Sequence, residues 1–178
     1  MSPPFPSEDD LGLLLDEPAS PPSLATVRAR IFSGITALER FSPHAPQVAS
    51  TLRIDFHEAR RALHDLSDAR GWTEIPPLPG VRIRPVVVGS GANRREVLGA
   101  MFAEIHPGGR IPVHRHHGSE VMVVLQGCLL DPAHPGGILG AGGVLASEDG
   151  SEHALEVPLD PDVTCLCLVV NDGWTEYL

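Results

Sequence analysis

The sequence predicts an all-β domain, a barrel or sandwich of short antiparallel strands, preceded by two amphipathic helices. After Trp72 the chain changes from helical periodicity to short runs rich in Val, Ile and Leu, separated by Gly- and Pro-rich turns. Seven such runs follow one another closely, and no helical pattern alternates with them, which argues against a parallel sheet. The strands are expected at 81–88, 96–105, 110–116, 120–126, 143–146, 154–157 and 163–170.

The 178 residues suffice for one hydrophobic core of ordinary size with a modest extension. Residues 1–23 contain many of the prolines and several acidic residues, and we expect them to form a disordered arm. Residues 24–71 are predicted to be a helical extension or linker, and residues 72–178 the β domain.

The helical extension contains two apolar stripes with intervals of three and four residues, the spacing of one helix face. The first consists of Leu24, Val27, Ile31, Ile35 and Leu38. The second consists of Leu52, Phe56, Ala59, Leu63 and Leu66. Asp55 and Glu58 are spaced like a capping box, and Gly71 follows at the C-terminal end. These stripes are expected to pack on each other or on the β domain, or to form a docking surface for a partner protein.

Composition excludes several functional classes. The net charge is −10, and the basic residues are thirteen arginines scattered from Arg28 to Arg115, so direct binding to nucleic acid is not expected. No apolar run approaches the roughly eighteen residues of a membrane span, and the N-terminus lacks the pattern of a secretory signal. We expect a cytoplasmic protein whose three cysteines are reduced.

A cluster of metal-ligating residue types lies in the predicted strands. Successive side chains on a strand alternate between faces, so His114 and His116 share one face. Glu120 begins the next strand and can direct its carboxylate to the same centre, and His153 is expected to add a fourth ligand from a later strand. Imidazole nitrogens combined with a carboxylate oxygen favour Zn, Fe, Mn, Ni or Co over Ca or Mg.

These residues lie in two stretches that resemble the two conserved motifs of the cupin superfamily. The first stretch has the form Gly-x5-His-x-His-x3-Glu-x6-Gly and runs from Gly108 to Gly127. The second matches at Gly142, Gly150 and His153, but has Glu148 in place of the usual proline and Val157 in place of the usual asparagine. The resemblance implies a cupin, RmlC-like jelly-roll fold, a double-stranded β-helix barrel. It also implies that His114, His116, Glu120 and His153 bind one divalent metal ion.

Within this superfamily, the chain is most similar to the cupin-like domain of ChrR-type anti-sigma factors. The similarity is carried by 114–120, 123–127, 150–153 and 165–168. It implies a zinc site and a role in stress-linked transcription control, in the family a response to photo-oxidative or peroxide stress. The family's sigma-binding domain also has a His-x3-Cys-x2-Cys motif, which this sequence lacks, since its first cysteine is Cys128.

Three functions remain open from the sequence. The first is a regulatory cupin with a closed zinc site and no catalytic residue. It is expected to form a homodimer, as many cupins do, and to dock a protein partner through the N-terminal helices. The second is a dioxygenase of small β-diketone-like substrates, in which Fe, Ni or Mn keeps open positions and Glu120 acts as a base. A purely structural metal barrel that only dimerises is a third. Only 4% of residues are aromatic, which favours regulation over a substrate-stacking pocket.

Two further sets of residues are assigned no functional role. His117, next to the metal ligands, is predicted to point away from the metal. Cys165 and Cys167 are expected to be buried thiols without a disulfide bridge, because a bridge between residues two apart would be strained.

Overall fold

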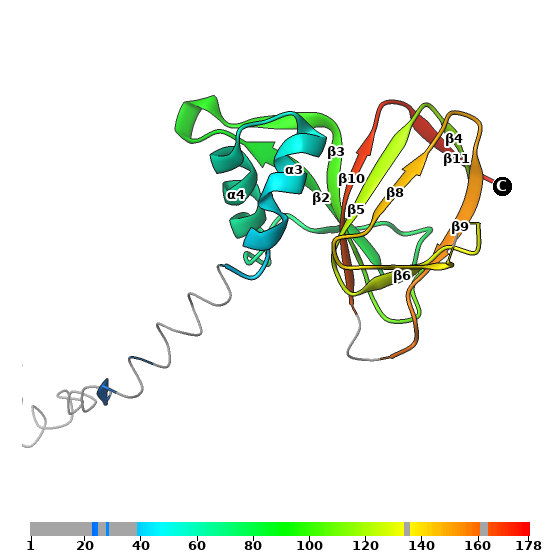
Figure 1. The fold of residues 1–178 in the computed structure, drawn as a ribbon, viewed down its shortest axis with the longest axis horizontal. Coiled ribbons are helices and arrows are strands. Elements are labelled where there is room, and N and C mark those ends of the chain that lie inside the picture. Colours follow the sequence, from blue (N-terminus) through cyan, green and yellow to red (C-terminus); the bar gives the residue numbers. More distant parts are fainter. Residues whose placement is uncertain (1–22, 25–27, 29–38, 134–135, 161–163) are drawn as a thin grey trace, which may run out of the picture. The chain divides into compact units, whose positions relative to one another are not determined.

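A computed structural model describes residues 23–24, 28, 39–133, 136–160 and 164–178 (Figure 1). The chain divides into two compact units, Met1–Thr36 and Ala37–Leu178, and the fold described below is that of the second. In the first unit Leu24 and Arg28 are helical. The rest of the first apolar stripe, and the predicted arm except Ser23, lie outside the described residues.

The second unit begins with a helical layer consisting of η1 (Ser42–His44), α3 (Ala45–Leu52) and α4 (Phe56–Asp65). Asp55 caps the start of α4 as predicted, since its carboxylate accepts hydrogen bonds from the amides of His57 and Glu58. The helix ends at Asp65 and not at Gly71. The second stripe is not one continuous helix, however. Leu52 ends α3, and Arg53 adopts a left-handed conformation with φ of 54° that turns the chain before α4 begins.

The β domain consists of two antiparallel sheets that face each other (Figure 1). One sheet contains, in spatial order, β1 (Thr73–Glu74), β2 (Val81–Val88), β3 (Arg95–Ile105), β10 (Cys165–Asn171), β5 (Glu120–Gln126) and β8 (Val144–Ser147). The other contains β11 (Trp174–Tyr177), β4 (Arg110–His117), β9 (Glu152–Glu156), β6 (Cys128–Leu130) and β7 (Ile138–Gly140). A short 3₁₀ helix, η2 (Gly91–Asn93), connects β2 to β3.

The all-β prediction is confirmed, and every predicted strand overlaps an observed one. β2 and β5 have the predicted bounds. Four short strands, β1, β6, β7 and β11, were not predicted because runs of two to four residues do not show a clear alternation of apolar and polar side chains. Of these, β11 has the greatest consequence, since it pairs with β4, the strand of His114 and His116.

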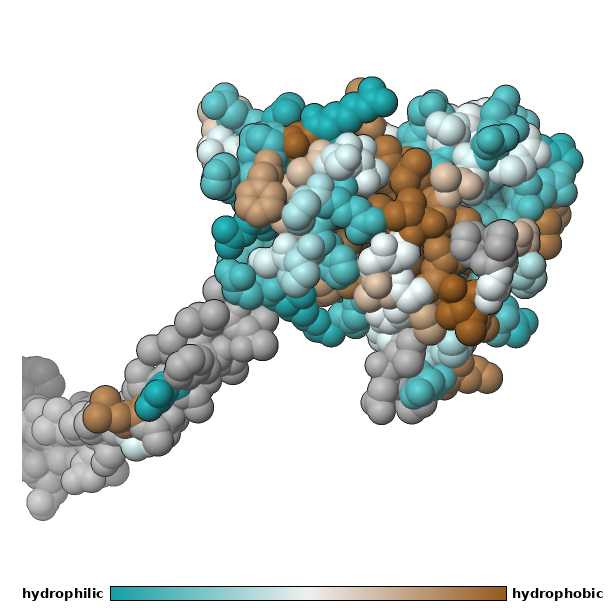
Figure 2. All heavy atoms as spheres, viewed as in Figure 1, coloured by the Kyte–Doolittle hydropathy of each residue, from teal (hydrophilic) through white to brown (hydrophobic). Residues whose placement is uncertain are grey.

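The six-stranded sheet is apolar on both faces and separates two core clusters. Along β10, Leu166 and Leu168 pack in the cluster that includes α3 and α4, whereas Cys165 and Cys167 pack in the cluster between the sheets. This alternation explains why β10 reads as a continuous apolar run in the sequence. The apolar faces of α3 and α4 therefore pack on the β domain. On the face shown in Figure 2, apolar residues gather where the helices meet the strands.

Within the described part of the chain, no helix has both the length and the apolar character that crossing a membrane requires.

Candidate metal centre

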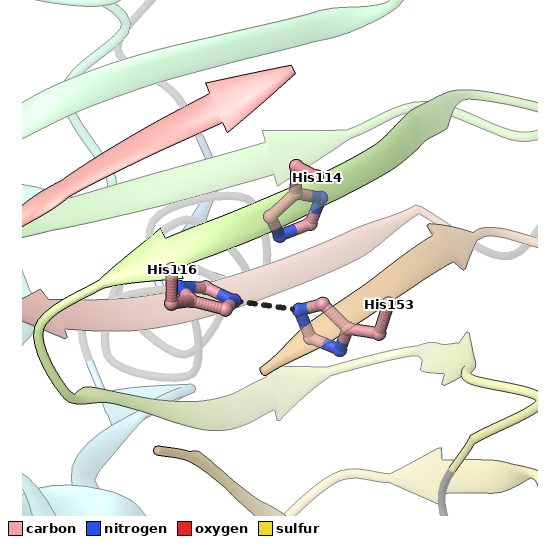
Figure 3. A group of neighbouring side chains, drawn as sticks. All are labelled: His114, His116 and His153. Atoms are coloured by element: carbon pink, nitrogen blue, oxygen red, sulfur yellow. Dashed lines mark hydrogen bonds between the residues drawn. The ribbon is translucent and has the colours of Figure 1, made fainter. Parts of the chain in front are cut away.

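Three of the four predicted ligands converge between the two sheets. His114 and His116 project from one face of β4, and His153 on β9 is the direct cross-strand partner of His114. Each histidine offers one ring nitrogen as a ligand atom, and these three nitrogens all lie within 4.8 Å of one another (Figure 3). All three side chains are buried, and His116 is 0% exposed.

Hydrogen bonds fix how two of the imidazoles present their nitrogens. Nδ1 of His114 lies 2.8 Å from the carbonyl oxygen of Pro112, and Nδ1 of His153 lies 3.0 Å from a carboxylate oxygen of Asp131. Because both oxygens only accept, each Nδ1 must donate its hydrogen, which leaves the lone pair on Nε2. Nε2 of His153 faces Nε2 of His116 at 3.0 Å (Figure 3). When two nitrogens bind the same zinc ion, each at about 2.0–2.1 Å, the two nitrogens are separated by roughly this distance.

A jelly roll of two antiparallel sheets thus brings together, in its interior, histidines from both of the spaced sequence motifs. The fold is that of a cupin. Its three clustered histidines form a site for a divalent metal ion.

Several solved structures are similar to this cupin. A protein of unknown function with a cupin-like fold from Ralstonia eutropha JMP134 is 24% identical, with 56% of this chain and 59% of that chain covered and a TM-score of 0.46. The match therefore spans less than two thirds of the Ralstonia protein. A chain in the structure of Rhodobacter sphaeroides SigE in complex with the anti-sigma ChrR is 27% identical, with 90% of this chain and 74% of that chain covered and a TM-score of 0.45. The DMSP lyase DddQ from Ruegeria pomeroyi DSS-3 is 16% identical, with 72% of this chain and 75% of that chain covered and a TM-score of 0.48. No protein-family model and no curated protein matches the chain.

The cupin interior favours the neutral form of His114 and His116, the form that metal binding requires. Burial, together with the neighbouring His114 and His153, lowers the pKa of His116 to about 4. Burial likewise lowers the pKa of His114 from its ordinary value. Protons therefore compete weakly with a metal ion for these nitrogens at neutral pH.

Glu120, the fourth predicted ligand, lies on the opposite sheet at the start of β5. Its carboxylate is buried, and one oxygen is 3.9 Å from Nδ1 of His116. Burial raises its pKa to about 7. Among the described residues, the group of mutually close ligand atoms contains the three histidines and not this carboxylate. Metal binding by Glu120 stays a prediction.

Asp131 is a residue of the cupin site that the sequence motifs did not indicate. It follows β6 and is only 1% exposed, with one carboxylate oxygen bonded to His153 and the other accepting the amide of Ala133 at 2.9 Å. The carboxylate therefore fixes the ring orientation of His153 and makes Nε2 a better donor to a metal ion. An acidic residue directly after an apolar strand was the available signal, but nothing in its spacing connects it to His153.

Replacing Asp131 by Ala is expected to weaken metal binding about 10- to 100-fold, because His153 loses the acceptor that orients it. Asp131→Asn, which keeps an acceptor oxygen without the charge, should have an intermediate effect. Zinc affinity measured by competition with a chromophoric chelator tests this. Asp68→Ala, which removes a carboxylate paired with the exposed Arg70, is the control and should bind zinc normally. Equal affinities for all the variants would contradict the orienting role.

The cupin barrel also encloses a cavity of about 250 Å³ that reaches two of the predicted ligands, His114 and Glu120. Most of its lining is apolar and comes from both sheets. Tyr177 on β11 lines the cavity as well, opposite His114 in the strand register. Tyr177 was not predicted as part of the site because β11 itself was not predicted.

The remaining expectations about histidine and cysteine are confirmed. His117 lies outside the cluster, stacks on Trp174 with ring centroids 3.9 Å apart, and hydrogen-bonds to Glu176. Cys165 and Cys167 are buried and free, with their sulfur atoms 3.6 Å apart.

Proposed function

We propose that this cupin is a regulatory protein that binds one zinc ion through His114, His116, His153 and Glu120 and acts in stress-linked transcription control. The observation that carries the metal part is the convergence of three buried imidazoles beside a buried carboxylate. Three imidazoles and one carboxylate complete the four-coordinate shell that zinc prefers in closed sites. The regulatory part rests on the sequence resemblance to ChrR-type anti-sigma factors.

The packing of β5 provides a route by which such a site could act on the helices. Glu120 starts β5, and three residues later Val123 packs in the same cluster as α3 and α4. A zinc ion held by Glu120 and the histidines would tie β5 to β4 and β9, so that loss of the ion would release the strand that supports the helices. The partner expected at the helices is a protein.

Elemental analysis of protein purified without added metal tests the zinc assignment, with one zinc per chain as the expected result. The regulatory role is tested by comparing transcripts after peroxide treatment in a strain with His114→Ala and His116→Ala and in a strain lacking the gene. Both strains should show the same changes relative to the parent. A His106→Ala strain, altered at an exposed histidine outside the cluster, should behave as the parent. Unchanged transcripts in both mutant strains would refute the regulatory role.

The apolar cavity favours a second candidate function, a metal-dependent dioxygenase of a small β-diketone-like substrate. A closed structural site has no need of a cavity that reaches its ligands, and Glu120, with a pKa of about 7, is suited to act as a base. Oxygen uptake by the iron- or nickel-loaded protein in the presence of acetylacetone is the test. Uptake that disappears with Glu120→Gln would replace the regulatory proposal with this one.

A further inference from the structure

We propose that the cavity binds a small, mainly apolar molecule of about eight non-hydrogen atoms, with one oxygen-bearing head group directed at the metal centre. The inference rests on the proposed metal site and adds the chemical class of its ligand. It follows from the lining of the cavity, its size, and the position of its polar groups.

The body of the cavity is apolar on every side. Met101 and Ala103 on β3 and Met122 on β5 come from one sheet, and Ile111 on β4 and Leu155 on β9 come from the other. These side chains belong to the core cluster between the sheets or pack against it. Sugars and nucleotides present many hydrogen-bonding groups, and such walls would leave those groups unpaired at a considerable cost. A hydrocarbon chain or a small ring loses nothing there.

The polar groups of the lining are two of the predicted ligands and three residues that pair with predicted ligands in the strand register. They are His114, Glu120, Asn171, Thr175 and Tyr177. Among the described residues that line the cavity there is no arginine, and the sequence contains no lysine. A phosphate or a dicarboxylate would therefore find no protein cation, and the Glu120 carboxylate would repel it. The suitable head group is neutral or carries one negative charge, which a divalent ion at the histidines would offset.

The volume sets an upper limit on the length of the ligand. About 250 Å³ is below the range of roughly 300–1,000 Å³ that drug-sized ligands occupy. It equals the share of about eight water molecules at roughly 30 Å³ each. A six-carbon carboxylate has about this number of non-hydrogen atoms.

The partly exposed lining residues mark where such a molecule would enter. Tyr177 on β11 is 50% exposed. Ile75, which directly follows β1, and Ile83 on β2 are partly exposed. β11 and β1 are edge strands of their sheets, and Ile83 on β2 pairs with Thr73 of β1, so these residues lie at a sheet edge or one strand from it. A ligand entering here would meet the apolar walls with its tail and the histidines with its head.

Calorimetric titration of the zinc-loaded full chain with hexanoate tests the proposal. Hexanoate should bind about tenfold more tightly than butyrate, since two buried methylenes are gained. Dodecanoate should not bind because it exceeds the volume, and glucose and inorganic phosphate should not bind because the walls and charges do not suit them. After removal of zinc with a chelator, hexanoate binding should weaken at least about tenfold, because the carboxylate head group loses the divalent charge that offsets its own.

A pair of variants on β3 places the ligand in this cavity. Ala103 faces the interior and lines it, whereas Ala100 packs in the cluster on the other face of the same sheet. Ala103→Leu should fill the cavity and weaken hexanoate binding about tenfold or more with zinc content unchanged, and Ala100→Leu should leave binding intact. Ile83→Phe, at the partly exposed edge, provides the same test if either core variant fails to fold by circular dichroism.

The outcomes separate this inference from the proposed function. A chain that binds no zinc refutes the metal site itself. A chain that binds one zinc but no hexanoate, or that binds hexanoate equally well with Ala103→Leu, refutes the ligand class and leaves the metal site standing. Binding of glucose or phosphate in place of hexanoate overturns the assignment of an apolar ligand.

Discussion

His116→Ala is expected to abolish stoichiometric metal binding and the stabilisation that the metal gives to the folded chain. His116 is the innermost of the three histidines, and its Nε2 lies 3.0 Å from that of His153, so no other described nitrogen replaces it at this position. Metal that binds only the folded state stabilises it by about 2.7 kcal/mol at one hundred times the dissociation constant, and by about 4.1 kcal/mol at one thousand times. The variant should lose this increment completely.

Calorimetric unfolding with zinc and with chelator measures this effect. The wild-type melting temperature should fall when chelator removes the metal, and that of His116→Ala should be the same under both conditions. His106→Ala is the matched control, because this histidine is paired with Glu104 at the surface and lies outside the cluster. A variant that is still stabilised by zinc to the wild-type extent would show that the metal binds elsewhere.

Phe102→Ala should lower the free energy of unfolding by about 3–5 kcal/mol, the usual cost of deleting a fully buried aromatic ring. Phe102 is 2% exposed on β3 and belongs to the core cluster that joins the sheet to α3 and α4. The cavity left behind would lie under the helices, so the attachment of the helical layer should weaken together with the barrel.

Urea denaturation monitored by circular dichroism gives the change in unfolding free energy. Leu98→Ala provides a control on the same strand, since Leu98 is 93% exposed and makes little contribution to the core. Its unfolding free energy should stay within about 0.5 kcal/mol of wild type. Similar losses for the two variants would mean that Phe102 is not part of a well-packed core.

The strands that the sequence predicted are those that are long and apolar enough to show a pattern. β2 and β5 were predicted to the residue because glycines mark their ends, Gly80 and Gly89 around β2 and Gly127 directly after β5. The three histidines could be predicted as one site because the motif encodes strand parity, which places His114 and His116 on one face, and because the family resemblance supplied His153.

The rest depended on contacts between residues far apart in the chain. Asp131 reaches His153 through the hairpin of β6 and β7 and the pairing of β6 with β9, which no local pattern indicates. Tyr177 lines the cavity because a four-residue strand pairs with β4. The orientation of the Glu120 carboxylate depends on side-chain torsions, about which spacing in the sequence contains no information.

β10 forms part of the boundary between the helical layer and the interior of the barrel, and this boundary is one backbone thick. Leu168 touches the helical side, and Cys167, its immediate neighbour, touches the barrel interior. If a molecule bound on one side displaced this strand, the side chains on the other side would move with it, and no hinge would be required. The interior of the barrel and the helical layer are therefore separated by a single layer of backbone.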